Sequence, residues 1–362
     1  MKSILLSAVL AFFALTANAT IRIVDQNGNA PSGVYSTFSS AHGDAQAGDT
    51  ILLTPSTASY GSLTITKEIT LLGIGFNPAS SSGTTSKVSS LYFQNGSDGT
   101  KIIGLEISNV IYLGYTTATS LSNVVIENCL ITSYVTHNST TTLANIFIRQ
   151  NVFNDPGSAS SISLNVTNQS NIIISNNVFA RSANNTHASI YANGGILVEH
   201  NLFLGTGVSN SYAFRQLSGA EVRNNIFYGR NPTSSQGLTN VQFFNNLAFG
   251  GTTTDLSSSS LSGFGTNVTG SNNLTSANPN FNGTITINTS LTNWDFSFDA
   301  TLSGTPDLST SSKDGSSELG IFGGSSPFKT SGSVVPVIQT LDLPTTIQQG
   351  TNTTADIVVT GN

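Results

Sequence analysis

The sequence predicts an all-β fold, a right-handed parallel β-helix solenoid with a short N-terminal capping helix. Three observations lead to this prediction. A repeat centred on asparagine runs through the middle of the chain, and its apolar residues follow the period of strands. Only 8% of the residues are charged, yet twenty phenylalanines are present. A solenoid suits this combination, because each coil packs on its neighbours and a long chain can bury apolar side chains coil by coil.

The first nineteen residues have the features of an export signal. Lys2 precedes an apolar run that is too short to cross a bilayer, and Ala17-Asn18-Ala19 forms a small-x-small site. We therefore expect residues 1–19 to be a signal peptide that is cleaved after Ala19. The protein is then expected to be secreted or held at a bacterial cell surface. Later residues contain no run of eighteen apolar side chains, so we expect no membrane span.

The solenoid is expected to start directly after this segment. Tyr35–Ala47 can form a short capping helix. Short apolar segments that are typical of strands follow at Ala47–Leu53, Leu63–Ile65 and Ile69–Gly73.

The central repeat aligns six segments on one asparagine each, spaced by 23, 26, 24, 24 and 21 residues. The residue three before this asparagine is always apolar, and the residue two after it is most often phenylalanine. A strand places every second residue on one face, so this odd step requires a turn at or beside the asparagine. Stacked turns bring the amides to about 4.8 Å, where they can bond from coil to coil. The predicted structural ladder consists of Asn128, Asn151, Asn177, Asn201, Asn225 and Asn246.

Two apolar columns flank the predicted ladder. Phe153, Phe179, Phe203 and Phe227 are expected to stack inside the coils. The residues four before the ladder, which are Val124, Phe147, Ile173 and Leu197, should face outward. Such an exposed row would be a partner-binding patch, unless a long loop or the C-terminal tail covers it. We favour a covering segment.

The repeat and its internal asparagines resemble the secreted bacterial right-handed parallel β-helices of the pectate-lyase-like superfamily. The N-terminal segments described above resemble the opening of such proteins. Asn278–Phe281, Trp294–Phe296 and Leu319–Gly324 resemble their closing segment. The resemblance implies a β-helix over residues 20–333. Residues 334–362 are expected to form a β tail that docks on the helix or begins a further module. Lyases, hydrolases and adhesins share this fold, so the resemblance does not imply an activity.

The charge and the cysteine content indicate which classes of partner and cofactor are not expected. The net charge is −6 and no Lys/Arg-rich run occurs, so nucleic acid is not expected as a partner. Cys129, the single cysteine, can form neither an internal disulfide nor a thiolate cluster. His200 is expected on the surface of a turn, and no second ligand has a fixed spacing to it. We predict no metal and no cofactor, except calcium if the protein is a lyase. A monomer is expected.

Candidate catalytic residues occupy the outward positions beside the ladder. Glu199 and Arg223 should be neighbours on adjacent coils, with Glu221 and Arg149 nearby. A lyase acting by β-elimination needs a base and groups that neutralise a uronate, and a glycoside hydrolase needs two carboxylates on one face. Cross-strand ion pairs explain the same pattern, and we favour that interpretation.

Tyrosines surrounded by Ser, Thr and Asn are the candidates for ligand binding. Tyr134, Tyr191, Tyr212 and Tyr228 can stack on sugar rings, although packing of loops on the coils is the favoured explanation for them. We therefore expect outer-face loops to bind a polysaccharide or another cell-envelope component without catalysis. The alternative is a polysaccharide lyase or, less favoured, a glycoside hydrolase that acts on an extracellular polysaccharide. A structural or ice-binding solenoid would need regular Thr columns, and the sequence has none in register.

Overall fold

The computed structural model of the 362-residue chain describes most of the solenoid. The predicted signal peptide, up to residue 18, and most of the predicted tail lie outside the described residues. The described residues are 19–28, 31–77, 83–116, 118–154, 160–165, 169–180, 188–207, 211–233, 237–285, 294–305, 307–331, 337–342 and 356–360.

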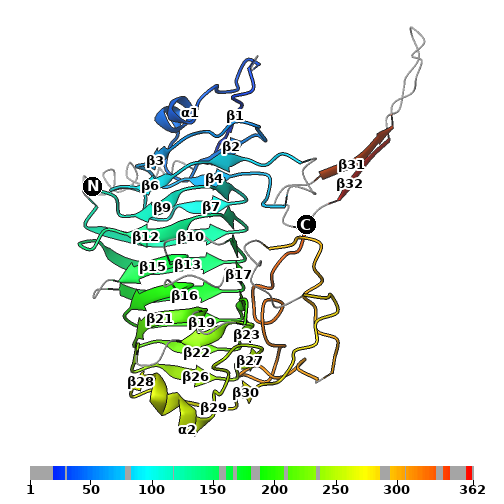
Figure 1. The fold of residues 1–362 in the computed structure, drawn as a ribbon. Coiled ribbons are helices and arrows are strands. Elements are labelled where there is room, and N and C mark those ends of the chain that lie inside the picture. Colours follow the sequence, from blue (N-terminus) through cyan, green and yellow to red (C-terminus); the bar gives the residue numbers. More distant parts are fainter. Residues whose placement is uncertain are drawn as a thin grey trace, which may run out of the picture.

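Three sheets of parallel strands wind into a β-helix, which confirms the predicted fold class (Figure 1). Apart from β1 (Ile21–Val24) with β2 (Thr50–Leu53) and β24 (Asn231–Thr233) with β25 (Leu238–Thr239), successive strands of the β-helix go to different sheets, and each sheet receives about one strand per coil. The eleven-stranded sheet contains β1 (Ile21–Val24), β2 (Thr50–Leu53), β4 (Thr70–Leu72), β7 (Lys101–Ile103), β10 (Ser120–Glu127), β13 (Thr142–Arg149), β16 (Gln169–Ser175), β19 (Ile196–Glu199), β22 (Glu221–Arg223), β26 (Gln242–Phe244) and β29 (Thr269–Ser271).

The other two sheets complete each coil. The nine-stranded sheet contains β5 (Lys87–Val88), β8 (Glu106–Ile107), β11 (Leu130–Ile131), β14 (Val152–Phe153), β17 (Val178–Ala180), β20 (Leu202–Leu204), β23 (Ile226–Tyr228), β27 (Leu247–Phe249) and β30 (Leu274–Thr275). The ten-stranded sheet contains β3 (Leu63–Ile65), β6 (Leu91–Phe93), β9 (Val110–Leu113), β12 (Tyr134–His137), β15 (Ile162–Asn165), β18 (Ile190–Asn193), β21 (Tyr212–Ser218), β24 (Asn231–Thr233), β25 (Leu238–Thr239) and β28 (Gly265–Thr266).

Short helices lie at the two ends of the coil stack (Figure 1). Helix α1 (Phe38–Asp44) confirms the predicted capping helix; the side chain of Thr37 accepts a hydrogen bond from the backbone N–H of Ser40, and Phe38 enters the core. At the opposite end, α2 (Ser258–Leu261) and the 3₁₀ turn η2 (Ser262–Phe264) bury Leu261 and Phe264. Such caps keep the apolar ends of the core away from water. In the predicted tail, β31 (Val337–Asp342) and β32 (Asp356–Thr360) pair antiparallel.

The core between the three sheets is a set of stacked columns. The rings of Phe153, Phe179, Phe203 and Phe227 lie almost parallel, with centroids 4.8, 4.8 and 5.0 Å apart. This spacing is close to the distance between neighbouring strands, since each ring comes from one coil. All four side chains are fully buried.

An asparagine ladder runs beside this column inside the turn between the eleven-stranded and nine-stranded sheets. From Asn177 onward, the side chain of each ladder residue accepts hydrogen bonds from the backbone N–H and the side-chain amide of the residue one coil before it; between Asn177 and Asn201 both are 3.0 Å long. The series contains Asn151, Asn177, Asn201, Asn225, Asn246 and Asn273. Asn273 is a member that the sequence analysis missed.

The alignment of the first repeat on Asn128 is wrong by one residue. Cys129 occupies the ladder position there, and its backbone N–H donates to the side chain of Asn151. Asn128 instead adopts φ 52°, the left-handed conformation of the preceding position. This one-residue error also reversed the predicted orientation of two neighbouring side chains. Val124 points into the core, and Val125 takes the outward position. Complete burial raises the pKa of the Cys129 thiol to about 12, so this side chain is an inert core residue.

A second column of side chains on the same turn forms hydrogen bonds to a later part of the chain, around residues 311–327. The residues just before the ladder have φ between 52° and 59°, and their side chains turn outward. Asn176 donates to the carbonyl oxygens of Ile321 and Gly323 at 2.9 and 2.8 Å. Gln150, Asn224 and Asn245 bond to the same region of the chain. We call residues 277–285, 294–305 and 307–331 the cover segment; these side chains fasten it to the coils.

The cover segment lies over the nine-stranded sheet, beside the coils (Figure 1). This sheet is apolar on both faces, because the residue after each ladder position is also apolar. The outer column of Val152, Val178, Leu202, Ile226 and Leu247 forms a second buried cluster with Trp294, Phe298, Leu308, Leu319, Ile321 and Phe328. A cover therefore exists, but over a different sheet from the one we expected. The outward row of Phe147, Ile173 and Leu197 stays half-exposed on the eleven-stranded sheet.

We predict that Asn176→Gly loosens the cover segment without disturbing the coil. Glycine keeps the left-handed backbone that Asn176 adopts, and it removes both hydrogen bonds to the cover. Amide hydrogen exchange should become faster in residues 319–324 and stay unchanged in β16 and β19. Asn145→Gly is the matched control, because Asn145 has φ 54° and lies exposed on another bend. Equal exchange in both variants would contradict the fastening role.

Candidate ligand-binding face

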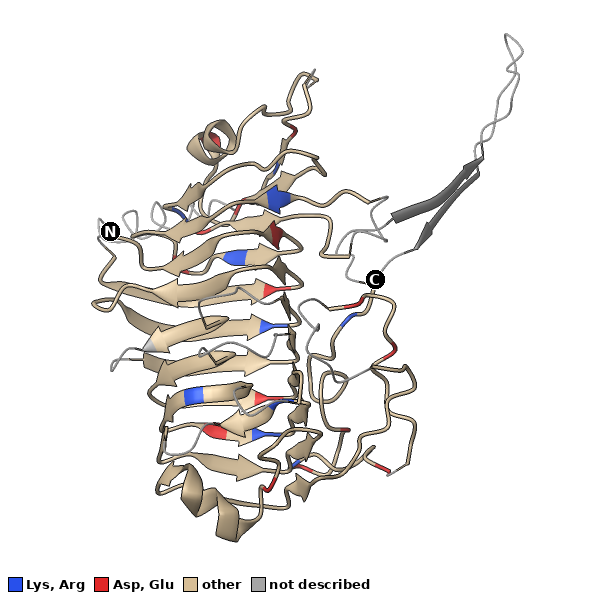
Figure 2. Cartoon of the chain, in the orientation of Figure 1, with Lys and Arg blue, Asp and Glu red and all other residues tan. Residues whose placement is uncertain are grey.

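The outer face of the eleven-stranded sheet carries charged residues that form ion pairs from strand to strand. Glu127, Arg149, Glu199 and Arg223 are the last residues of β10, β13, β19 and β22, and Figure 2 shows red and blue positions at the ends of several strands of this sheet. The register places Glu127, Arg149, Ser175, Glu199 and Arg223 in one outward column, one residue per strand. Glu127 was missed in the sequence because the one-residue slip at Asn128 put Ile126 in its place.

Two separate ion-pair groups form in this column. Arg149 Nε lies 2.7 Å from Glu127 Oε2, and Arg223 Nη2 lies 2.7 Å from Glu199 Oε2. Two strand spacings, about 10 Å, separate Arg149 from Glu199, because Ser175 stands between them. The structure thus brings together Glu199, Arg223 and Glu221, and it leaves Arg149 apart.

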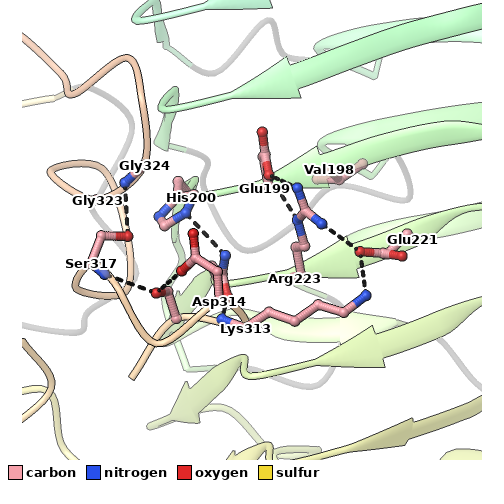
Figure 3. Close-up of polar contacts among 12 residues, drawn as sticks. Val198, Glu199, His200, Glu221, Arg223, Lys313, Asp314, Ser317, Gly323 and Gly324 are labelled. Carbon is pink, nitrogen blue, oxygen red and sulfur yellow. Dashed lines mark hydrogen bonds and ion pairs between the residues drawn. The ribbon is translucent and has the colours of Figure 1, made fainter. Parts of the chain in front are cut away.

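The second group is a four-membered network that includes a residue from the cover segment (Figure 3). Arg223 also bonds Glu221 at 2.9 Å, and Glu221 Oε1 lies 2.8 Å from the ammonium group of Lys313. Lys313 in turn sits 4.0 Å from the ring centroid of Phe244. Lys313 was not predicted, since nothing in its local sequence connects it with a strand some ninety residues earlier.

This network fixes the charge on Arg223. Partial burial alone would lower the pKa of Arg223, but the hydrogen bonds to Glu199 and Glu221 and their negative charges outweigh burial and raise it. A guanidinium held in this way cannot act as a proton acceptor near neutral pH. Both carboxylates accept hydrogen bonds from the same guanidinium group.

His200 closes the inner side of a hollow of about 410 Å³ next to this network. Contrary to the expected place on the surface of the turn, its side chain is buried beneath the cover segment. Nδ1 lies 3.3 Å from the carbonyl oxygen of Gly320 and Nε2 lies 3.0 Å from the amide nitrogen of Asn224. Nδ1 must therefore donate and Nε2 accept, the arrangement of a neutral ring. Burial lowers the pKa of His200, in agreement with that state.

Asp314 and Gly324 complete the outer wall of this hollow (Figure 3). Hydrogen bonds from the Ser312 and Ser316 side chains hold the pKa of Asp314 well below its usual range. The described residues include no group of three or more His, Cys, Asp and Glu side chains placed to hold a metal ion. The expectation about cofactors stays a prediction.

A second hollow lies on the same sheet at the other end of the strands. It measures about 340 Å³ and opens over β16, β19, β22 and β26. Ile173 and Leu197, from the half-exposed apolar row, form its floor, and Asn171 and Asn240 stand on its rim. Glu221 lines this hollow too and bonds to Arg223 and Lys313, which line the first one. The two hollows are therefore neighbours across one ion-pair network.

The candidate tyrosines do not converge on one site. Tyr134, Tyr191 and Tyr212 lie half-buried along the ten-stranded sheet, and Tyr134 and Tyr191 are two strands apart in neighbouring columns. Tyr228 packs on Phe249 and Phe281 under the cover segment, and burial raises its pKa. A closer group, which the sequence analysis did not assemble, joins Tyr115 to Tyr92 and Tyr112 with ring centroids 4.4 and 5.2 Å apart.

Comparisons with known proteins add no functional assignment. No family model matches the chain, and no curated protein matches it either. No helix in the described part of the chain is long and apolar enough to cross a membrane. The outer face of the eleven-stranded sheet, with its two hollows and its ion-pair network, is therefore the basis for a functional proposal.

Proposed function

We propose that this protein is a secreted or cell-surface bacterial β-helix of the pectate-lyase-like superfamily that binds a neutral glycan on its eleven-stranded sheet without catalysis. The observation that supports this proposal most is the hollow over Ile173 and Leu197, which has amide side chains on its rim and Glu221 as its one charged lining residue. A sugar ring has an apolar face and a rim of hydroxyl groups, so an apolar floor and amide neighbours suit it. The export signal and the superfamily resemblance support the proposed location.

The charge distribution favours a neutral glycan over a uronate. A uronate chain needs cations that are available to its carboxylates, yet Arg149 and Arg223 are each bonded to glutamate. Glu221 is the charged side chain among the residues that line the hollow, and the whole chain carries −6. An acidic polymer would be repelled, whereas a neutral one would not.

The same ion pairs argue against the lyase and hydrolase alternatives. β-Elimination requires a group that accepts a proton near neutral pH, and the raised pKa of Arg223 makes it unsuitable. Glycoside hydrolysis requires one carboxyl group that can donate a proton, and Glu199 and Glu221 are both held by Arg223.

Affinity electrophoresis through gels that contain one polysaccharide each tests this proposal. The panel is mixed-linkage β-glucan, xyloglucan, galactomannan and xylan as neutral polymers, with polygalacturonate and alginate as acidic ones. At least one neutral polymer should slow the protein, and Leu197→Asp should weaken that retardation at least tenfold. Val125→Asp is the matched control, since it places the same charge in the same outward column three strands away.

Catalysis is tested on the same polymers. We expect neither a rise in absorbance from unsaturated uronates nor a release of reducing ends. Turnover that is abolished by Glu199→Gln and by Arg223→Ala would contradict the proposal and identify the ion-pair network as an active site.

A further inference from the structure

A second, outer asparagine ladder marks the bend between the ten-stranded and eleven-stranded sheets. Asn145 donates to Asn123 at 2.9 Å, Asn171 to Asn145 at 2.8 Å, and Asn267 to Asn240 at 2.9 Å, in each case from the amide nitrogen to the oxygen one coil earlier. All five have φ between 53° and 58°. Four of these side chains are exposed and that of Asn145 is half-exposed, so this ladder forms a raised ridge on the outside of the bend.

The ridge is interrupted in two successive coils. The register places Gly195 and Gly219 in the column between Asn171 and Asn240. Two ladder side chains are therefore missing over three strand spacings, or about 14 Å. Asn171 uses its amide nitrogen toward Asn145, and Asn240 uses its oxygen toward Asn267. The carbonyl oxygen of Asn171 and the amide of Asn240 thus face the gap, and no described residue bonds to either.

Hollows lie on both sides of this gap. Gly195 and Gly219 line the hollow of about 340 Å³ on the eleven-stranded sheet. Gly194 and Gly237 line another, of about 610 Å³, on the ten-stranded sheet, together with Arg215, Gln216 and Thr239. A side chain at either gap position would form a wall between the two hollows. The missing side chains at Gly195 and Gly219 therefore leave a notch in the ridge, and this notch connects the two hollows across the bend.

The notch also aligns with the hollow beside His200. Strands β19 and β22 run from the notch toward Glu199 and Arg223, a distance of about 13 Å for four residue steps. The three hollows thus follow one line, which runs along the strands and across the axis of the coil stack.

We infer that the notch seats an extended, uncharged polysaccharide chain, which crosses the bend along the strands of β19 and β22. This inference rests on the proposed glycan binding and adds the path and the linear form of the ligand. Hydroxyl groups of the chain bond the carbonyl oxygen of Asn171 and the amide of Asn240, which the interrupted ladder leaves available. Ile173 and Leu197 lie under the adjoining sugar ring.

Gly219→Asn fills the notch and is the decisive variant. Gly219 has φ +64°, close to the ladder asparagines, and an added Cβ meets no atom nearer than 3.7 Å. The new side chain can continue the ladder from Asn240, so the melting temperature should stay equal or rise. We expect at least tenfold weaker retardation by the neutral polymer of the above panel that binds the wild type. Gly195→Ser is a second filling variant, since an added Cβ there meets its nearest atom at 3.6 Å.

Gly304→Asn is the matched control. Gly304 has φ +79° in the cover segment, with open space around an added Cβ. Normal binding by this control and weak binding by both filling variants would support the notch. Equal binding by the wild type and both filling variants would overturn the notch and leave glycan binding intact. Retention of a uronate alone, or of no polymer in the panel, would overturn the notch and the proposed function together.

Discussion

Phe203→Ala is expected to lower the free energy of unfolding by about 3–5 kcal/mol. Phe203 lies in the middle of the stacked phenylalanine column, with Phe179 on one side, Phe227 on the other and Phe214 at its edge. Removal of the ring leaves a cavity between two rings that the backbone spacing holds apart. The strand pairing of three sheets fixes that spacing, so the coil cannot collapse to fill the space.

Unfolding in guanidinium chloride, monitored by circular dichroism, measures this loss of free energy of unfolding. Phe147→Ala is the matched control, because Phe147 has the same side chain on the half-exposed outer face of β13. It should cost roughly 1 kcal/mol or less. Similar losses for the two variants would mean that the phenylalanine column does not govern the stability of the core.

Asn201→Leu is expected to cost about 3 kcal/mol or more, although the leucine side chain has the same number and branching of heavy atoms. Asn201 accepts from the backbone N–H and the amide of Asn177, and it donates to Asn225 and to the carbonyl oxygens of Ile174 and Glu199. All of this lies inside the coil. Each buried polar group that loses its partner costs roughly 1–3 kcal/mol, and leucine removes several partners at once.

The position along the ladder provides the control for this prediction. Asn273 is the last described member, and it is half-exposed, so water can replace lost partners there. Asn273→Leu should therefore cost clearly less than Asn201→Leu in the same titration. Equal costs would show that the loss comes from leucine in the turn and not from the broken ladder.

The sequence was sufficient to predict the solenoid because the repeat is local and regular. Phenylalanine and asparagine recur at the same positions of most repeats. The aligned repeats therefore indicate which residues stack on one another in successive coils. The prediction failed at Asn128 because Cys129 fills the ladder position and an asparagine happens to precede it. Both residues fit the turn, and no rule of spacing distinguishes them.

The candidate site could be predicted only where it lies on the repeat. The pairing of Glu199 with Arg223 follows from the register of adjacent coils, so the sequence predicted it. Lys313 and the cover segment could not be placed, because their contacts join residues up to 177 positions apart without a repeat to align them. A usable signal existed, however. The apolar residue after each ladder position, such as Val178 and Leu202, indicates a sheet that must be covered on its outer side.

The late position of the cover segment has a consequence for biosynthesis. Coils form from local contacts, so they can assemble while the chain is still emerging in N-to-C order. The outer column from Val152 to Leu247 then stays in contact with water until residues such as Trp294 and Phe328 arrive. During that interval the growing solenoid exposes a continuous hydrophobic surface that favours association with other chains. Nascent chains that stop before the cover segment should therefore depend on chaperones or aggregate, although their coils are already formed.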